Sequence, residues 1–150
     1  MKATLIFAVA VLSAVGAVFL YTTNFTDYLF DDPATCNNCH VMGTVYEGWG
    51  HSTHRPWATC NDCHTPHDFV RKSITKATNG IRHVTAFATG SIPVAIRALP
   101  QSRDVVQENC IRCHEDAVSL ISAGEMDAER YCFECHRAVA HGPRAIALEP

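Results

Sequence analysis

The sequence predicts a mainly α-helical fold, in which one N-terminal transmembrane helix precedes a small domain of short helices and loops. Three observations indicate this fold. Residues 3–26 carry no charge, and all eight cysteines fall into four short motifs of one type. No stretch of useful length alternates polar and apolar residues as a half-buried β-strand does. Because 150 residues make one small domain at most, we expect a membrane anchor at 1–26 and one domain at 27–150.

The N-terminal anchor is predicted from its length and composition. As a helix, the charge-free residues between Lys2 and Asp27 would extend about 36 Å, which is enough to cross a hydrocarbon core of about 30 Å. Aromatic residues follow from Tyr21 to Phe30, as at a membrane–water interface. The alternative is a cleaved signal peptide, since Ala14-Val15-Gly16 resembles a cleavage site. The apolar run continues beyond that site, which favours an uncleaved anchor in the inner membrane.

The orientation of this anchor follows from its flanking charge. Lys2 is the only charged residue before the span, and positive charge accumulates on the cytoplasmic side of membrane proteins. We therefore expect the N-terminus in the cytoplasm and the domain on the periplasmic face.

Four C-x-x-C-H motifs account for every cysteine in the chain. This motif attaches c-type haem, because two thiols at this spacing reach the two vinyl groups on one edge of the porphyrin, while the histidine lies beneath the ring. Zinc sites, disulfides and redox dithiols also use C-x-x-C pairs, but none of them requires a histidine after every pair. The cysteine pairs are Cys36 with Cys39, Cys60 with Cys63, Cys110 with Cys113, and Cys132 with Cys135, followed by His40, His64, His114 and His136.

Four covalent haems are therefore expected, and in 150 residues they must themselves form the core of the domain. Closely packed haems exchange electrons readily, so the sequence predicts electron transfer. A nucleic-acid partner is not expected, because Lys+Arg 12 against Asp+Glu 15 gives a net charge of −3 and no basic footprint.

The spacing of the motifs predicts two di-haem halves, about 36–67 and 110–141, separated by a haem-free insertion at 68–105. Between Phe69 and Ala88, apolar residues recur near helical spacing with basic residues between them. This pattern predicts one or two basic amphipathic helices, interrupted near Asn79-Gly80. Their apolar positions could lie on a membrane surface, or could cover haem faces while the basic residues pair with haem propionates.

Four six-coordinate haems need eight axial ligands, and the chain offers slightly more than it needs. Met42 is too close to His40 to reach the opposite face of the same haem. It could replace His40 on that face, where a thioether raises the haem potential, or it could only pack on the ring. Beyond the motifs, the candidate ligands are His51, His54, His67, His83, His141, Met42 and Met126.

The whole pattern resembles the membrane-anchored tetrahaem quinol dehydrogenases of the nitrate/nitrite reductase type. Beyond the anchor, the likeness rests on C-N-N-C-H-V-M at 36–42, W-x-x-S-x-H at 49–54, C-N-D-C-H-x-P-H at 60–67 and C-F-E-C-H-R-x-V-A-H at 132–141. It implies oxidation of menaquinol and relay of electrons to a periplasmic partner, the pentahaem catalytic subunit of cytochrome c nitrite reductase. Three alternatives remain. The protein could oxidise quinol for a nitrate or trimethylamine N-oxide reductase, could be an electron-transfer hub without a quinol site, or could be a reductase in its own right.

The resemblance also implies roles for individual residues. Lys76 would belong to a quinol site beside the first haem, with His83 standing where the family has an acidic residue. His83 could accept a quinol proton, being near its pKa at working pH, or could bind the first haem. His51 and His67 are expected to meet propionates or an interface. The implied iron ligands are Met42 on the first haem, His64 on the second with a lysine of the partner, His114 with His141 on the third, and His136 with His54 on the last.

Overall fold

The structure is a computed structural model that describes residues 2–22, 24–93, 96–122 and 130–142. The described residues form helices and connecting segments without a β-strand, so the mainly α prediction is confirmed. Met126 lies outside the described residues. The helices are α1 (Lys2–Thr22), α2 (Pro33–Cys36), α3 (Gly43–Gly50), α4 (Cys60–His64), α5 (Phe69–Ala88), α6 (Pro100–Ser122) and α7 (Cys132–Cys135), with short 3-10 helices η1 (Phe25–Leu29) and η2 (His40–Met42).

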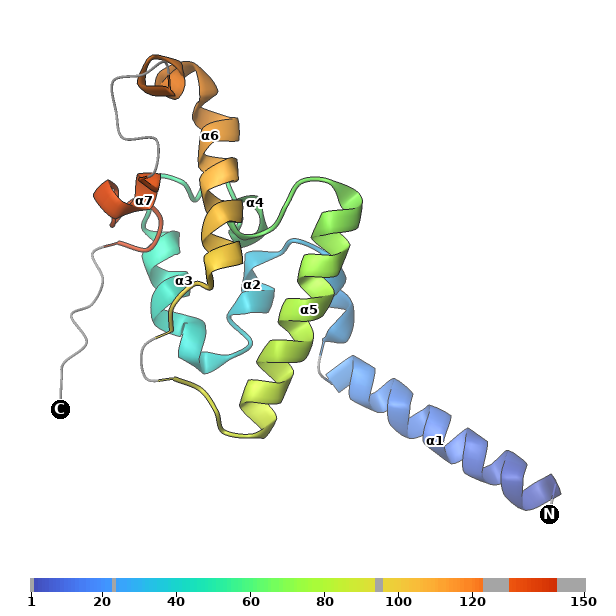
Figure 1. Cartoon of the computed structure of the whole chain (residues 1–150). Coiled ribbons are helices and arrows are strands. Elements are labelled where there is room, and N and C mark those ends of the chain that lie inside the picture. The colour runs from blue at the N-terminus through green and yellow to red at the C-terminus, as the bar shows by residue number, and fades with distance from the viewer. Residues whose placement is uncertain (1, 23, 94–95, 123–129, 143–150) are drawn as a thin grey trace.

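Helix α1 projects away from the other helices (Figure 1). It is long and apolar enough to cross a membrane, and none of its residues is buried. Its large side chains are widely exposed, as Phe7 and Leu12 at 71% each show. A core helix of a soluble domain would bury such side chains against its neighbours, whereas a helix in lipid does not need protein partners.

The domain has no apolar core made of its own side chains. Among the described residues no hydrophobic side chain is buried, and the buried polar residues are Thr35, Thr65 and Asn109. The Asn109 amide donates to the carbonyl oxygens of Cys63 at 3.0 Å and Thr65 at 2.9 Å, which joins α6 to the end of α4. A domain organised in this way fits the expectation that prosthetic groups supply the core.

Helix α5 runs without interruption from Phe69 to Ala88, so the predicted break near Asn79-Gly80 is wrong. A glycine inside a helix costs only about 1 kcal/mol relative to alanine. The Asp68 side chain caps the helix by accepting from the Arg71 amide at 2.7 Å, and such a cap contributes a comparable amount. A single glycine is therefore too weak a signal to end a helix of this length.

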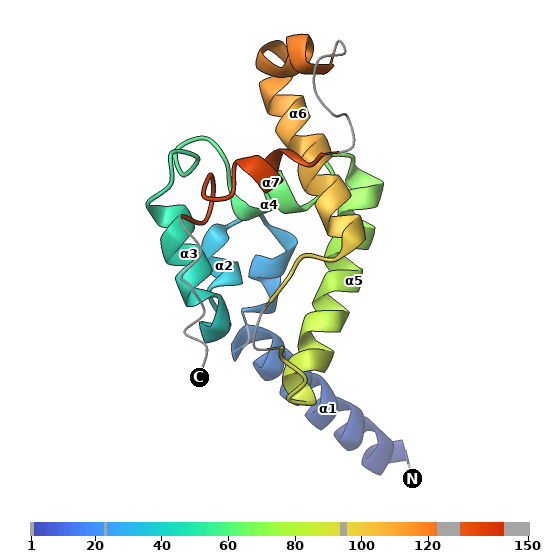
Figure 2. The same cartoon turned by 60° about the vertical axis from the view of Figure 1, so that its left-hand side comes forward.

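Helix α6 begins inside the predicted insertion and continues through the third haem motif. Its backbone leaves helical geometry at His114, with φ −108° and ψ 21°. Figures 1 and 2 show α5 and α6 side by side, with α3 and α7 on the side of the domain far from α1. This arrangement brings the four motifs together from α2, α4, α6 and α7.

Candidate functional site

The four C-x-x-C-H motifs lie on or beside short helical turns. Cys36 ends α2, Cys60 begins α4, Cys110 lies within α6 and Cys132 begins α7. Residues three apart in a helix share a face, so α4, α6 and α7, which each contain both cysteines of a motif, present the two sulfur atoms on one side, as attachment to one porphyrin edge requires. All eight thiols are free in the structure.

The first two motifs meet directly through their leading cysteines. A hydrogen bond with Cys60 lowers the pKa of the Cys36 thiol to about 7, against the opposing effect of burial. The same hydrogen bond, with burial second, raises the pKa of Cys60. Thioether formation would remove both protons, so the lasting consequence is positional: the first and second attachment sites are neighbours.

The second and third motifs are joined by polar contacts. Besides the Asn109 contacts, the guanidinium Nη2 of Arg112 lies 2.7 Å from Nε2 of His67. Arg112 stands inside the third motif, and His67 follows the second by three residues. His67 thus contacts a neighbouring motif.

The fourth motif is held on α6 by Arg103. Its guanidinium lies 2.7 Å from the Glu134 carboxylate and 4.5 Å from the ring centre of Tyr131. The Tyr131 hydroxyl donates to Asp104 at 2.6 Å, and the Cys132 amide donates to the Gln107 side chain at 2.8 Å. These contacts place α7 against the N-terminal half of α6.

Two pairs of histidines have ring centres at the separation expected of axial ligands. The ring centres of His54 and His114 are 6.1 Å apart, and those of His64 and His141 are 6.0 Å apart. Two imidazoles on opposite faces of one metal ion, each about 2 Å from it, have ring centres about 6 Å apart. The separation of the ring centres in each pair therefore matches that of two histidines on one haem iron.

Backbone carbonyls orient two of these rings. Nδ1 of His54 lies 3.1 Å from the Val139 carbonyl oxygen, and Nδ1 of His141 lies 3.3 Å from that of Val45. A carbonyl only accepts, so each Nδ1 donates its proton and each Nε2 keeps its lone pair for a metal.

The protonation of His64 also suits an iron ligand. Although part of its surface remains accessible, desolvation by the surrounding atoms, with the neighbouring His141 second, lowers its pKa to about 4. It is therefore neutral near pH 7, as a metal ligand must be.

The ring contacts differ from the pairs that the resemblance implies. His54 lies against His114 rather than in the implied pair with His136, and His141 lies against His64 rather than in the implied pair with His114. His136 follows α7 directly as its C-cap residue. Met42 is half-buried at the start of α3, its amide donating to the Cys39 carbonyl at 2.8 Å.

Gly48 positions His141 by leaving room for it. A Cβ atom at Gly48 would lie 2.2 Å from the carbonyl oxygen of His141 and 2.7 Å from its carbonyl carbon. Only glycine permits this approach of α3 to the His141 backbone. The sequence analysis missed Gly48, since a glycine inside a short helix gives no signal of what packs on it.

The two residues expected at a quinol site lie on one face of α5, because Lys76 and His83 are seven residues apart. The Lys76 ammonium donates to the carbonyl oxygens of Phe30 at 2.7 Å and Leu29 at 3.3 Å, and to the Asp31 carboxylate at 2.9 Å. These acceptors belong to the segment that follows the membrane anchor, so Lys76 lies beside the exit of the chain from the membrane.

Asp31 connects this segment to α5 and to the second haem motif. Its carboxylate accepts from Lys72 and Lys76, and from the Asn61 amide at 2.8 Å. Burial alone would raise the pKa of Asp31, but the hydrogen bonds and charges of the two lysines outweigh it and lower that pKa. The sequence analysis also missed Asp31, although two lysines four residues apart on one helix could have suggested a shared acidic partner.

His83 is available as a proton acceptor. Partial desolvation of its ring, followed by the charge of Arg82, lowers the pKa of His83, although much of the side chain is exposed. It is therefore neutral near pH 7, with a free lone pair.

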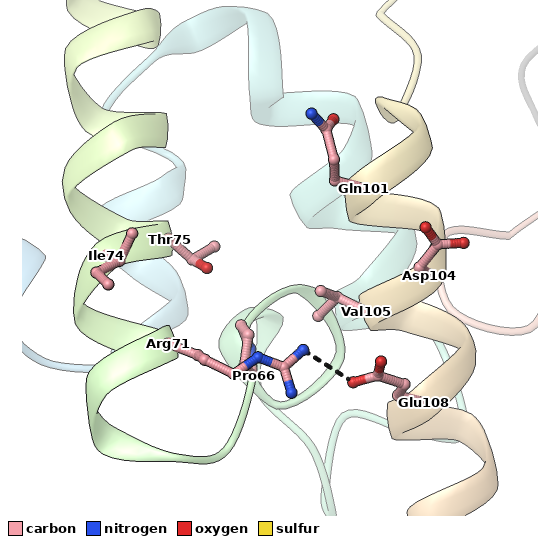
Figure 3. A pocket seen from close by; sticks show the side chains of 8 residues that line it. All are labelled: Pro66, Arg71, Ile74, Thr75, Gln101, Asp104, Val105 and Glu108. Carbon is pink, nitrogen blue, oxygen red and sulfur yellow. Dashed lines mark hydrogen bonds and ion pairs between the residues drawn. The ribbon is translucent and has the colours of Figure 1, made fainter.

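A cleft of about 360 Å³ lies between α5 and α6 (Figure 3). The Arg71 guanidinium, from α5, spans its mouth to reach Glu108 of α6 at 3.2 Å. Its other lining residues include Ile74, Pro66 and Val105, but neither Lys76 nor His83. The cleft is thus separate from the predicted quinol-site residues.

Three features define the class of the protein as a membrane-anchored c-type cytochrome. They are an apolar helix that leaves the domain, haem-attachment motifs on or beside helices, and paired histidines. The chain belongs to the NapC/NirT cytochrome c family, whose N-terminal region matches residues 1–98. Covalently bound haem c and electron transfer follow from this membership.

Characterised relatives cover most of the chain. The cytochrome c-type protein NrfH of Wolinella succinogenes is 36% identical over 97% of this chain and 88% of its own. The cytochrome c nitrite reductase subunit NrfH of Nitratidesulfovibrio vulgaris is 33% identical over 86% of this chain and 79% of its own. The cytochrome c-type protein NapC of Escherichia coli is 28% identical over 77% of this chain and 71% of its own.

Among solved structures, the chain is similar to one in the cytochrome c nitrite reductase NrfHA complex bound to the inhibitor HQNO. The TM-score is 0.69 at 32% identity, covering 95% of this chain and 93% of the other. The likeness therefore extends over the anchor and the domain together.

Proposed function

We propose that the protein is a membrane-bound menaquinol dehydrogenase that relays electrons through four c-type haems to a periplasmic cytochrome c nitrite reductase catalytic subunit. The observation that carries this proposal is the likeness, over 95% of the chain, to a chain of the NrfHA complex. The pentahaem catalytic subunit is the proposed partner, with the haem domain on the periplasmic side of the inner membrane.

The haems would be held by the eight motif cysteines. Met42, His54, His64, His114, His136 and His141 are the proposed iron ligands, and haem supplies one-electron redox chemistry when bound. The ring contacts favour His54 with His114 and His64 with His141 as axial pairs. This leaves Met42 and His136 as ligands of the remaining two haems.

The proposed quinol site lies at Lys76 and His83. Oxidation of a quinol to a quinone releases two electrons and two protons, and the electrons pass to the haems. His83, neutral near pH 7, accepts one proton from a quinol hydroxyl, and the second proton passes to water. The Lys76 ammonium has three N–H donors, and its contacts with Phe30, Leu29 and Asp31 use all three. It would orient the head group by giving up the longest of these contacts, the one with the Leu29 carbonyl oxygen at 3.3 Å.

The test compares Lys76→Ala with the wild type in vesicles containing menaquinol. We expect Lys76→Ala to keep four haems, to be reduced normally by dithionite, and to lose menaquinol-dependent haem reduction. Arg71→Ala is the matched control, because Arg71 lies on the same helix but contacts Asp68 and Glu108. Unchanged menaquinol-dependent reduction in Lys76→Ala would refute the site.

The same experiment distinguishes a menaquinol dehydrogenase from the alternative, an electron-transfer hub without a quinol site. Such a hub would be reduced by a protein donor but by menaquinol neither in the wild type nor in the variants. Copurification of the native complex identifies the reductase that receives the electrons.

A further inference from the structure

Helix α5 carries an exposed apolar stripe that its contacts with the domain do not use. The stripe consists of Phe69, Val70, Ile81, Val84 and Phe87, which are 84%, 64%, 70%, 68% and 67% exposed. At about 100° per residue these side chains fall within about 120° of the helix circumference.

The contacts of α5 with its surroundings lie on another side of the helix. Lys72 and Lys76 reach Asp31, and Arg71 reaches Glu108. The face that carries the two lysines is about 100° around the axis from the centre of the apolar stripe. The stripe thus begins beside the lysine face, with Phe69 and Phe87 about 20° from Lys76, and extends from there around the helix away from that face. Ile74 rather than the stripe lines the cleft with α6.

The position of α5 points to the membrane as the partner of this stripe. Lys76 donates hydrogen bonds to the carbonyl oxygens of Leu29 and Phe30. Leu29 ends η1 and Phe30 follows it, so these bonds hold α5 beside the place where the chain leaves the anchor. Figures 1 and 2 show α5 crossing the direction of α1 steeply, while α3 and α7 lie on the far side of the domain. When α1 crosses a bilayer, a helix that crosses the direction of α1 and is fixed to its exit runs along the interface.

The cations of this segment do not single out anionic lipid. Residues 69–99 contain five Lys or Arg and no Asp or Glu, but Arg71, Lys72 and Lys76 pair with Glu108 and Asp31, and Arg82 lies about 160° around the helix from the centre of the stripe. The apolar stripe therefore carries the membrane contact, because an amphipathic helix binds in the plane of the interface with its apolar side among the upper acyl chains.

We propose that α5 is a second membrane contact of the protein, which lies in the outer interface of the bilayer with the stripe among the upper acyl chains of the lipids. This contact does not depend on the proposed quinol chemistry. It would hold the domain in one orientation on the membrane, which a single anchor helix does not do by itself.

The test uses the full-length, haem-loaded protein in vesicles of phosphatidylcholine and phosphatidylglycerol that contain a phosphatidylcholine with a photoactivatable diazirine in its acyl chain. After illumination, peptide mass spectrometry locates the labelled residues. We expect label in α1 and in the peptide that spans 81–88, both with and without phosphatidylglycerol in the vesicles.

Two variants make the result specific to the stripe. Phe87→Asp is expected to lower labelling of the 81–88 peptide several-fold while α1 stays labelled and the haem content is unchanged. Trp57→Asp is the matched control, because Trp57 is 85% exposed but lies between α3 and α4, and it should leave labelling unchanged. Label confined to α1 in the wild type would overturn the proposal. Loss of haem from Phe87→Asp would also overturn it, by showing that the stripe covers a haem.

Discussion

Replacing Gly48 with alanine should detach His141 from the haem iron that we propose it binds. The new Cβ would lie 2.2 Å from the His141 carbonyl oxygen, whereas an ordinary carbon–oxygen contact is about 3.3 Å. The backbone at His141 must therefore move by about 1 Å. Bonds from metal to ligand tolerate only about 0.2 Å, so the imidazole cannot keep its bond unless α3 moves instead.

The sign of the effect separates this clash from ordinary helix propensity. Glycine to alanine inside a helix is otherwise stabilising by up to about 1 kcal/mol. Gly50→Ala is the matched control, because it lies on the same helix and a Cβ there meets nothing within 4 Å. We expect Gly50→Ala to be neutral or slightly stabilising.

The assay is electron paramagnetic resonance of the oxidised protein, together with a haem count. Gly48→Ala should retain its full haem content, since no cysteine is changed, and should convert one low-spin haem to a high-spin or altered low-spin form. A Gly48→Ala spectrum identical to that of Gly50→Ala would refute the placement of His141 as a ligand.

Three further variants test other parts of the site. Asp31→Asn should destabilise the domain by about 1 kcal/mol near pH 7, an exposed ion-pair estimate. The pKa of Asp31 is lower in the folded state than in the unfolded state. The stability that Asp31 contributes is therefore present above the unfolded-state pKa and is lost as pH falls through the folded-state pKa. The acid denaturation curves of the variant and the wild type should consequently converge at low pH. The pKa of His83 is also lowered, so the rate of quinol oxidation should fall only as pH drops below about 6.5, and His83→Asn should remove this dependence in a pH–rate profile. Arg103→Gln breaks the contacts with Glu134 and Tyr131. It should lower the thermal midpoint of unfolding by an amount equivalent to about 1–2 kcal/mol. A midpoint equal to that of the wild type would contradict the docking of α7 on α6.

The sequence predicts those features of the fold that local patterns determine. The anchor follows from uninterrupted apolar composition, the haem-attachment turns from cysteine spacing, and α5 from helical periodicity. The continuity of α5 through Gly80 was not predicted, because a local cost of about 1 kcal/mol is offset by capping at Asp68 and contacts at Lys72 and Lys76 that no local pattern reveals.

The site divides in the same way. Which residues can bind haem is visible in the motifs, but which histidines share an iron depends on how distant segments pack. His54 and His114 are brought together by the α6 geometry and by the Val139 carbonyl. Asp31 and Gly48 act only through tertiary contacts, one by gathering two lysines and the other by lacking a side chain.

The most direct test of the proposed function is the reduction of the haems by menaquinol in the full-length protein, reconstituted in vesicles without a reductase and followed by the haem α-band. The account predicts that menaquinol reduces the haems in the wild type, and that an added nitrite reductase catalytic subunit with nitrite reoxidises them. Haems that dithionite reduces but menaquinol leaves oxidised would contradict it.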